Sequence, residues 1–131
     1  MIAALSLSLA CLATESSAGF QIGETYWSNT GQTFTGVSVP ASCTIYSRVQ
    51  ANSYFYFNGN YFVGGYVQSV VIVSGPNGLV HQLSVFATPD NPHQSDERFA
   101  FNQPAGFYAV YHIVSLSNPA GDARTLTTLT W

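Results

Sequence analysis

The sequence contains no lysine and few charged residues of either sign. Lys, Arg, Asp and Glu together make up 7% of the 131 residues, whereas about 25% is usual in soluble domains. The three arginines, Arg48, Arg98 and Arg124, are isolated from one another. Because a phosphate backbone is bound by clustered Lys and Arg, this pattern and the net charge of −3 argue against a nucleic-acid partner. The polar surface must consist of Ser, Thr, Asn and Gln, as in many secreted β proteins.

Recognisable catalytic and cofactor motifs are also missing. Nucleophilic catalysis needs Ser or Cys, a His and an acid brought together, and no G-x-S-x-G elbow is present. Cys43 and His112 can be drawn as a dyad, but both fall on strands expected in the core. The sequence therefore predicts a non-enzyme without a cofactor.

One acidic cluster is a candidate metal-binding site. Asp90, Asp96 and Glu97 lie near Asn91 and His93 in a polar stretch, and oxygen ligands on a flexible loop suit Ca²⁺. The cluster lacks the every-second-residue ligands of an EF-hand, and a solvated loop is the simpler interpretation. No metal site is predicted, and calcium binding by these acids stays an open alternative.

The N-terminus reads as a leader. Residues 2–13 are apolar but too short to span a bilayer, and small residues precede a cleavage point after Ala18. The prediction is a signal peptide at 1–18, a domain at 19–131, no integral membrane segment, and a secreted, periplasmic or cell-surface location. Lipidation at Cys11 and a buried N-terminal segment are the alternatives. Without Cys11, Cys43 is expected to be a small buried hydrophobic residue, although pairing between chains stays open.

Short strands separated by Gly, Pro and Asn turns fill the remainder of the chain. No window beyond the leader shows an apolar period of 3.6 residues. The pattern predicts an all-β fold, a single antiparallel β-sandwich of about 8–9 strands. The expected strands cover residues 19–28, 33–39, 42–50, 67–73, 79–86, 99–102, 107–114 and 124–131, together with an Asn58-Gly59 hairpin.

The stretch 98–117 is the expected centre of the fold. Phe99 and Phe101 alternate with smaller residues, Pro104 and Gly106 supply a corner, and 107–114 is apolar enough to be buried on both faces. The preceding segment, 87–97, carries two prolines and three acids and is expected to be a polar loop.

Three motifs resemble those of bacterial immunoglobulin-like domains. They are VIVSGPNGLV (71–80), PAGFYAVYHIV (104–114) and SNPAGDARTLTTLTW (117–131), and the match covers about half of the chain. The resemblance implies an immunoglobulin-like sandwich in which Tyr108, beside Pro104 and Gly106, forms a tyrosine corner with its ring inside. It also favours Tyr108, Val110 and His112 as the inward face of their strand. Val110 replaces the second cysteine of the antibody pattern, so no disulfide is implied.

The Tyr- and Asn-rich hairpin is the best candidate for a ligand site. Side chains alternate along a strand, so burial of Phe55 and Phe57 turns their neighbours outward. Flat aromatic area with amide groups suits a protein or carbohydrate ligand. The alternative is packing of the whole segment. The predicted contact residues are Tyr54, Tyr56, Asn58, Asn60 and Tyr61.

Three functions are compatible with these features. The first is a secreted, non-catalytic binding or adhesion module that uses the hairpin. The second is a structural subunit of an extracellular fibre or surface assembly, with self-association through β edges. The third is a secreted inhibitor or immunity-type protein that inserts the acidic 87–97 loop into a partner enzyme.

Overall fold

The computed structural model describes residues 19–27, 30–63, 65–117 and 121–131, and of these it gives only the backbone of 23–27, 55–57 and 61–63. The predicted leader and Cys11 lie outside the described residues. Within the described part of the chain, no helix is long and apolar enough to cross a membrane. Ten strands follow one another: β1 Gly19–Trp27, β2 Gly31–Val39, β3 Cys43–Asn52, β4 Tyr54–Phe57, β5 Asn60–Val63, β6 Val67–Gly75, β7 Gly78–Ala87, β8 His93–Gln103, β9 Gly106–Leu116 and β10 Asp122–Thr130.

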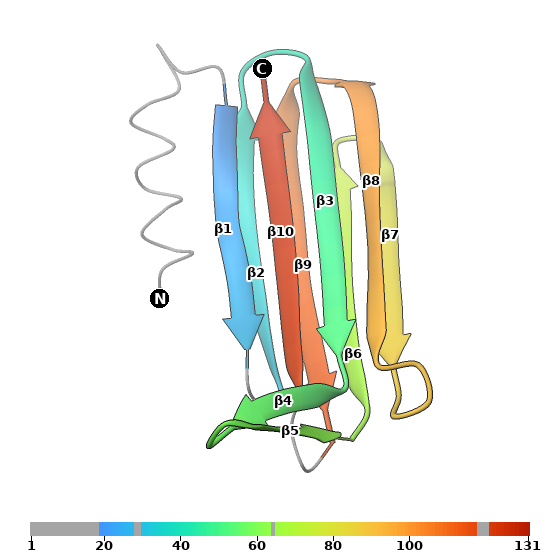
Figure 1. Ribbon diagram of the computed structural model, residues 1–131. Coiled ribbons are helices and arrows are strands. Elements are labelled where there is room, and N and C mark those ends of the chain that lie inside the picture. Colours follow the sequence, from blue (N-terminus) through green and yellow to red (C-terminus); the bar gives the residue numbers. More distant parts are fainter. Residues whose placement is uncertain (1–18, 28–29, 64, 118–120) are drawn as a thin grey trace.

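Eight of these strands form two four-stranded antiparallel sheets that pack face to face (Figure 1). Sheet A has the order β1-β10-β3-β8, and sheet B has the order β2-β9-β6-β7. Strands β4 and β5 form a separate hairpin across one end of the sandwich (Figure 1). The prediction of a single all-β sandwich of antiparallel strands is confirmed.

The order of strands within the sheets is that of a jelly roll. The chain behaves as a long folded ribbon, because β1 pairs with β10, β2 with β9, β3 with β8 and β6 with β7. In an immunoglobulin sandwich the first two strands share a sheet, whereas β1 and β2 lie in opposite sheets here. The immunoglobulin-like resemblance is therefore not confirmed beyond the sandwich architecture.

Strict alternation along the strands builds the core. In β3 every second residue from Cys43 is buried, while Thr44, Tyr46 and Arg48 are only partly covered. Side chains of the two sheets meet in one large apolar cluster, and a second cluster lies at the end near β4 and β5. Cys43 is a buried free thiol within the large cluster, as expected. Burial is the first cause of the raised pKa of this thiol.

Two sequence-based expectations about strands are wrong. The polar loop predicted at 87–97 is limited to residues 88–92, because β8 begins at His93. Strand β8 is at the edge of sheet A, and most of its residues are exposed. An edge strand with solvent on one face tolerates charges, and for this reason its composition resembles that of a loop.

The second correction concerns β9. This strand is interior within sheet B, between β2 and β6, but only one of its faces is buried. The inward residues are Tyr108, Val110 and His112, as the tyrosine-corner comparison favoured. Phe107, on the other face, is 57% exposed. Burial on both faces requires a covering layer, and none of the described residues supplies one on the outside of sheet B.

Tyr108 fixes the corner between β8 and β9. Its ring is fully buried, and its hydroxyl donates a hydrogen bond to the carbonyl oxygen of Pro104. Burial and the neighbouring Cys43 raise the pKa of Tyr108 to about 12. Gly106 has a φ of 145°, and a Cβ there would collide with the ring of Pro76. The turn therefore requires glycine at this position.

Candidate ligand-binding face

The Asn58-Gly59 hairpin forms as predicted. Both residues have positive φ angles, 50° and 77°, which is the backbone conformation of a two-residue hairpin turn. Asn58 and Asn60 are exposed, and the Asn60 amide donates to the Asn58 carbonyl over 3.4 Å. The backbones of Tyr56 and Tyr61 pair with each other, but their side chains lie outside what the structure describes.

Tyr54 joins the hairpin to the start of β8. Its hydroxyl contacts Nε2 of His93, and the two rings meet edge to face with centroids 4.5 Å apart. Nδ1 of His93 lies 2.6 Å from Oδ1 of Asn52, whose amide nitrogen donates to Asp122 over 2.6 Å. Because Asn52 Oδ1 only accepts, His93 donates to it from Nδ1. The contact aligns Tyr54 with the outer face of sheet A.

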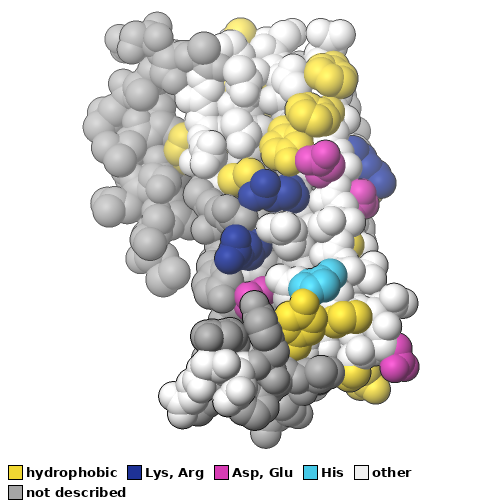
Figure 2. Space-filling view, viewed as in Figure 1, with side chains coloured by type: hydrophobic (Ala, Val, Ile, Leu, Met, Phe, Trp, Pro, Cys, Tyr) yellow, Lys and Arg dark blue, Asp and Glu magenta, His cyan; other side chains and the backbone are white. Residues whose placement is uncertain are grey.

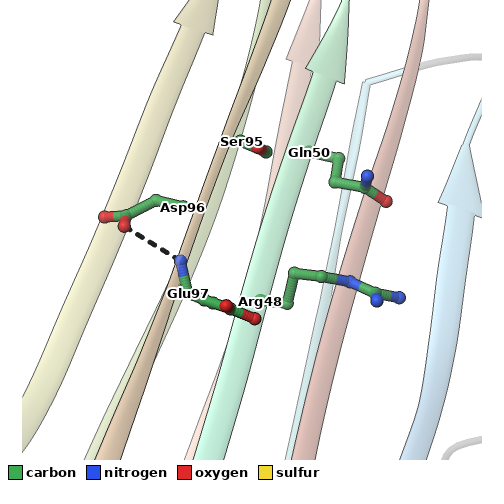
Figure 3. Close-up of a pocket in the computed structure, with 5 residues that line it drawn as sticks. All are labelled: Arg48, Gln50, Ser95, Asp96 and Glu97. Atoms are coloured by element: carbon green, nitrogen blue, oxygen red, sulfur yellow. Dashed lines mark hydrogen bonds between the residues drawn. The ribbon is translucent and has the colours of Figure 1, made fainter.

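The next part of this face is a shallow pocket of about 370 Å³, lined by Arg48, Gln50, Ser95, Asp96 and Glu97. In Figure 3, Arg48 and Gln50 extend to the same side of β3, and Asp96 points to the opposite side of β8. Oδ1 of Asp96 accepts the backbone N–H of Glu97 over 2.9 Å. Asp96 therefore lies at the rim of the pocket, and the Arg48 guanidinium, the Gln50 amide and the Glu97 carboxylate give its outward side both signs of charge.

An aromatic ladder lies beyond the pocket. Tyr46 is paired with Phe99 across β3 and β8, and their ring centroids are 4.6 Å apart. Phe99 and Phe101 are stacked with an interplanar angle of 3° and are 53% and 64% exposed. The Tyr46 hydroxyl donates to Glu97 over 2.6 Å, and this hydrogen bond is the first cause of the raised pKa of Tyr46. The ladder and the pocket are therefore physically connected.

We call this surface the β3–β8 face and define it by the outward residues of the two strands. Ala100 packs against the core, so the odd-numbered residues of β8 face outward. Figure 2 shows hydrophobic side chains gathered over one end of these strands, with basic and acidic side chains beside them. The face consists of Tyr46, Arg48 and Gln50 on β3 and His93, Ser95, Glu97, Phe99 and Phe101 on β8.

A second polar cluster lies between the sheets. Nε2 of His81 is 3.0 Å from Oγ of Ser47, a distance suited to a nucleophile and its base. Ser47, however, has no exposed surface, so a substrate cannot reach its hydroxyl. The cluster continues to Thr127 and to His112, whose nitrogens contact the hydroxyls of Thr125 and Thr127 at 2.9 Å. We interpret these contacts as internal hydrogen bonding of buried polar groups.

The acids considered for calcium do not converge. Asp90 lies in the turn between β7 and β8, and Asp96 and Glu97 alternate on β8. Among the residues that the structure describes, no group of three His, Cys, Asp or Glu side chains is placed to hold a metal ion.

Most of the β3–β8 face was not predicted from the sequence. Phe99 and Phe101 indicated a strand, and the polar residues before them were expected to form a loop. The missing signal was the alternation of His93, Ser95, Glu97, Phe99 and Phe101 across that supposed boundary. Of the predicted contact residues, Tyr54 reaches this face through His93, while Asn58 and Asn60 lie at the hairpin turn.

Comparisons with known proteins concern the fold. No protein-family model and no curated protein sequence matches the chain. One similar solved structure is PliG from Aeromonas hydrophila, a periplasmic inhibitor of g-type lysozyme, with 6% identity, a TM-score of 0.44, and 88% of both chains covered. Another is a CBM36-1 domain of a multidomain xylanase from the hindgut metagenome of Trinervitermes trinervoides, with 10% identity, a TM-score of 0.41, and coverage of 90% of this chain and 93% of that one.

A third is TmCBM61 in complex with β-1,4-galactotriose, with 14% identity, a TM-score of 0.44, and coverage of 81% of this chain and 67% of that one. Values this low express a general likeness among all-β domains and carry no argument about a ligand.

Proposed function

We propose that the protein is a secreted, non-catalytic module that binds a carbohydrate chain along the β3–β8 face. The observation that carries the proposal is the aromatic ladder of Tyr46, Phe99 and Phe101 leading directly into the polar pocket. The apolar face of a sugar ring stacks on exposed aromatic rings, and its hydroxyls need polar partners close by. Adjacent exposed aromatic rings form an apolar patch, and such patches mark interaction sites.

The polar groups suit a neutral, hydroxyl-rich ligand. Arg48 lies opposite Glu97 in the strand register, and Gln50 lies opposite Ser95. A pocket with both signs of charge does not select strongly for an anion or a cation, whereas hydroxyl groups can both donate to carboxylates and accept from guanidinium or amide groups. Tyr54 adjoins this face through its contact with His93, and Asn58, Asn60, Tyr56 and Tyr61 belong to the proposal as predicted contacts. Export follows from the leader expected at 1–18.

A protein ligand is the alternative outcome. The inhibitor hypothesis relied on an acidic loop at 87–97, and this part of it loses support because β8 begins at His93. A partner enzyme could still occupy the same flat face, so the test must distinguish sugars from proteins.

The test is a glycan array followed by calorimetry with the oligosaccharide that binds best. Phe99→Ala combined with Phe101→Ala should weaken affinity by about 30-fold or more, because truncating buried contact aromatics costs about 2 kcal/mol. Phe34→Ala is the matched control, since Phe34 is 53% exposed, like Phe99, but lies on sheet B. It should leave the affinity unchanged.

Two outcomes would contradict the proposal. One is a folded double variant that keeps full affinity for the glycan. The other is an array without binding, together with retention of a protein partner that the double variant loses, which would move the assignment to protein recognition.

A further inference from the structure

Sheet B carries no formal charge. The sequences of β2, β6, β7 and β9 contain no Asp, Glu, Lys or Arg. Their two histidines, His81 and His112, are buried between the sheets. The described charged residues lie on sheet A or in the turn before β8. The outer face of sheet B is consequently a surface four strands wide without a charged side chain.

Large apolar side chains occupy this outer face. Phe34, Phe86 and Phe107 are 53%, 52% and 57% exposed, and they lie on β2, β7 and β9. Phe34 packs on Tyr111 with ring centroids 5.0 Å apart. Half-buried residues fill the middle of the sheet, namely Val70 and Ile72 on β6 and Ala109, Tyr111 and Ile113 on β9. Uncharged polar residues, Gln68, Gln82 and Ser84, share the face around Phe86, so the apolar side chains are densest over β2, β9 and the middle of β6. Large exposed apolar patches mark interaction sites.

The dimensions of this surface suit a protein interface. Four strands at about 4.8 Å spacing and about nine residues at about 3.4 Å each give a face of roughly 19 by 30 Å. Two such faces in contact bury at least about 1,100 Å² in total, which is near the lower limit of stable specific interfaces. A small ligand would leave most of the area exposed.

We propose that this face binds the same face of a second copy of the chain, so that two sandwiches stack through their B sheets. In a two-fold dimer the same face is used by both copies, residues near the axis meet their own equivalents, and like charges there would repel. An uncharged sheet has no such cost, and β-sheets already pack face to face within the sandwich at about 10 Å. The second copy is thus the occupant that fits the area and the lack of charge.

The dimer would present two β3–β8 faces on opposite sides. Sheet A lies on the side of each sandwich away from sheet B (Figure 1). If the proposed function is right, the assembly is bivalent and gains avidity on a repeating polymer. The dimer itself does not depend on the identity of the ligand.

The test is analytical ultracentrifugation of the full chain at increasing concentration. The wild type should form a dimer at about 100 μM or below. Phe34→Lys and, separately, Phe86→Lys should raise the dissociation constant of the dimer by about 10-fold or more. Each variant would bury two unpaired ammonium groups in the interface, one from each copy. These residues lie on opposite edge strands of sheet B, and since both are half exposed, folding should survive.

Phe99→Lys is the matched control, since Phe99 has the same 53% exposure as Phe34 but lies on sheet A. It should leave the dimer intact, and salt should not weaken the association. A wild type that stays monomeric overturns the proposal. The proposal is also overturned if Phe99→Lys dissociates the dimer while the folded Phe34→Lys and Phe86→Lys variants leave it unchanged. Monomeric wild type with normal glycan binding would reject the dimer and leave the proposed function standing.

Discussion

The two sheets contribute similar side chains to the interior and very different ones to the outside. Inward positions of both sheets are mostly Val, Leu, Ile and small residues, joined by a few hydroxyls and two histidines. Outward, sheet A presents arginines, acids and the stacked Phe99–Phe101 pair, whereas sheet B presents an uncharged surface of aromatic, aliphatic and a few Gln and Ser side chains. The period of two in a strand makes this separation possible, because alternate residues face different environments. The interior therefore specifies the sandwich, and the outer faces are free to specify partners.

The largest effect on stability should come from replacing a buried aromatic residue of β9 by alanine, compared with the same replacement of its exposed neighbour. Tyr108 and Phe107 are neighbours on β9, with exposures of 0% and 57%. Tyr108→Ala should lower the free energy of unfolding by about 3–5 kcal/mol, because it leaves a cavity and an unpaired carbonyl. Phe107→Ala should cost less than about 1 kcal/mol. Urea denaturation measures both, and equal losses would show that the two sides of β9 are not distinct.

A smaller effect should come from acid, through the polar contacts between the sheets. Burial lowers the pKa of His112 from 6.5 to about 4, and burial and then Arg98 lower the pKa of His81. Because the folded-state values are depressed, the unfolded chain binds more protons below pH 6.5. Stability is complete above that pH and falls as the pH drops from 6.5 toward 4. His112 alone should cost about 2 kcal/mol between pH 7 and pH 5.

His112→Asn provides the control for this pH dependence. The variant should be less stable at pH 7, because the hydroxyls of Thr125 and Thr127 lose a partner. Its further loss between pH 7 and pH 5 should be smaller than that of the wild type. If both proteins lose the same stability over this interval, the buried imidazole is not the cause.

Much of the fold could be predicted because local signals agreed with it. Alternation from Cys43 to Ser47, the Asn58-Gly59 turn and the Pro104–Gly106 corner each indicated structure that the chain adopts. The assignment of strands to sheets could not be predicted from the sequence, because it depends on pairing between distant segments, such as β1 with β10 and β2 with β9. Local patterns carry no information about which distant strand is the partner, and the immunoglobulin resemblance filled that gap with a different strand order.

The site was harder to predict than the fold. The aromatic hairpin could be predicted as a candidate site from its local composition. The β3–β8 face, in contrast, is assembled from two strands about fifty residues apart in the sequence, which place Tyr46 beside Phe99. Tyr46 and Arg48 become part of a common surface only because β8 places Phe99 and Glu97 beside them. The charged residues of the edge strand β8 also led to the prediction of a loop. Tertiary pairing, rather than any local motif, creates this surface.

We propose that the ligand binds the β3–β8 face and not the outer face of sheet B. The most direct measurement is an NMR titration of the labelled protein with the best-binding oligosaccharide from the array. If the oligosaccharide binds along the β3–β8 face, chemical shift changes will concentrate at Tyr46, Arg48, Gln50 and the odd-numbered residues of β8, and the signals of Phe34 and Tyr111 will stay unchanged. Changes confined to the outer face of sheet B, or to the hairpin turn at Asn58 and Gly59, would contradict it.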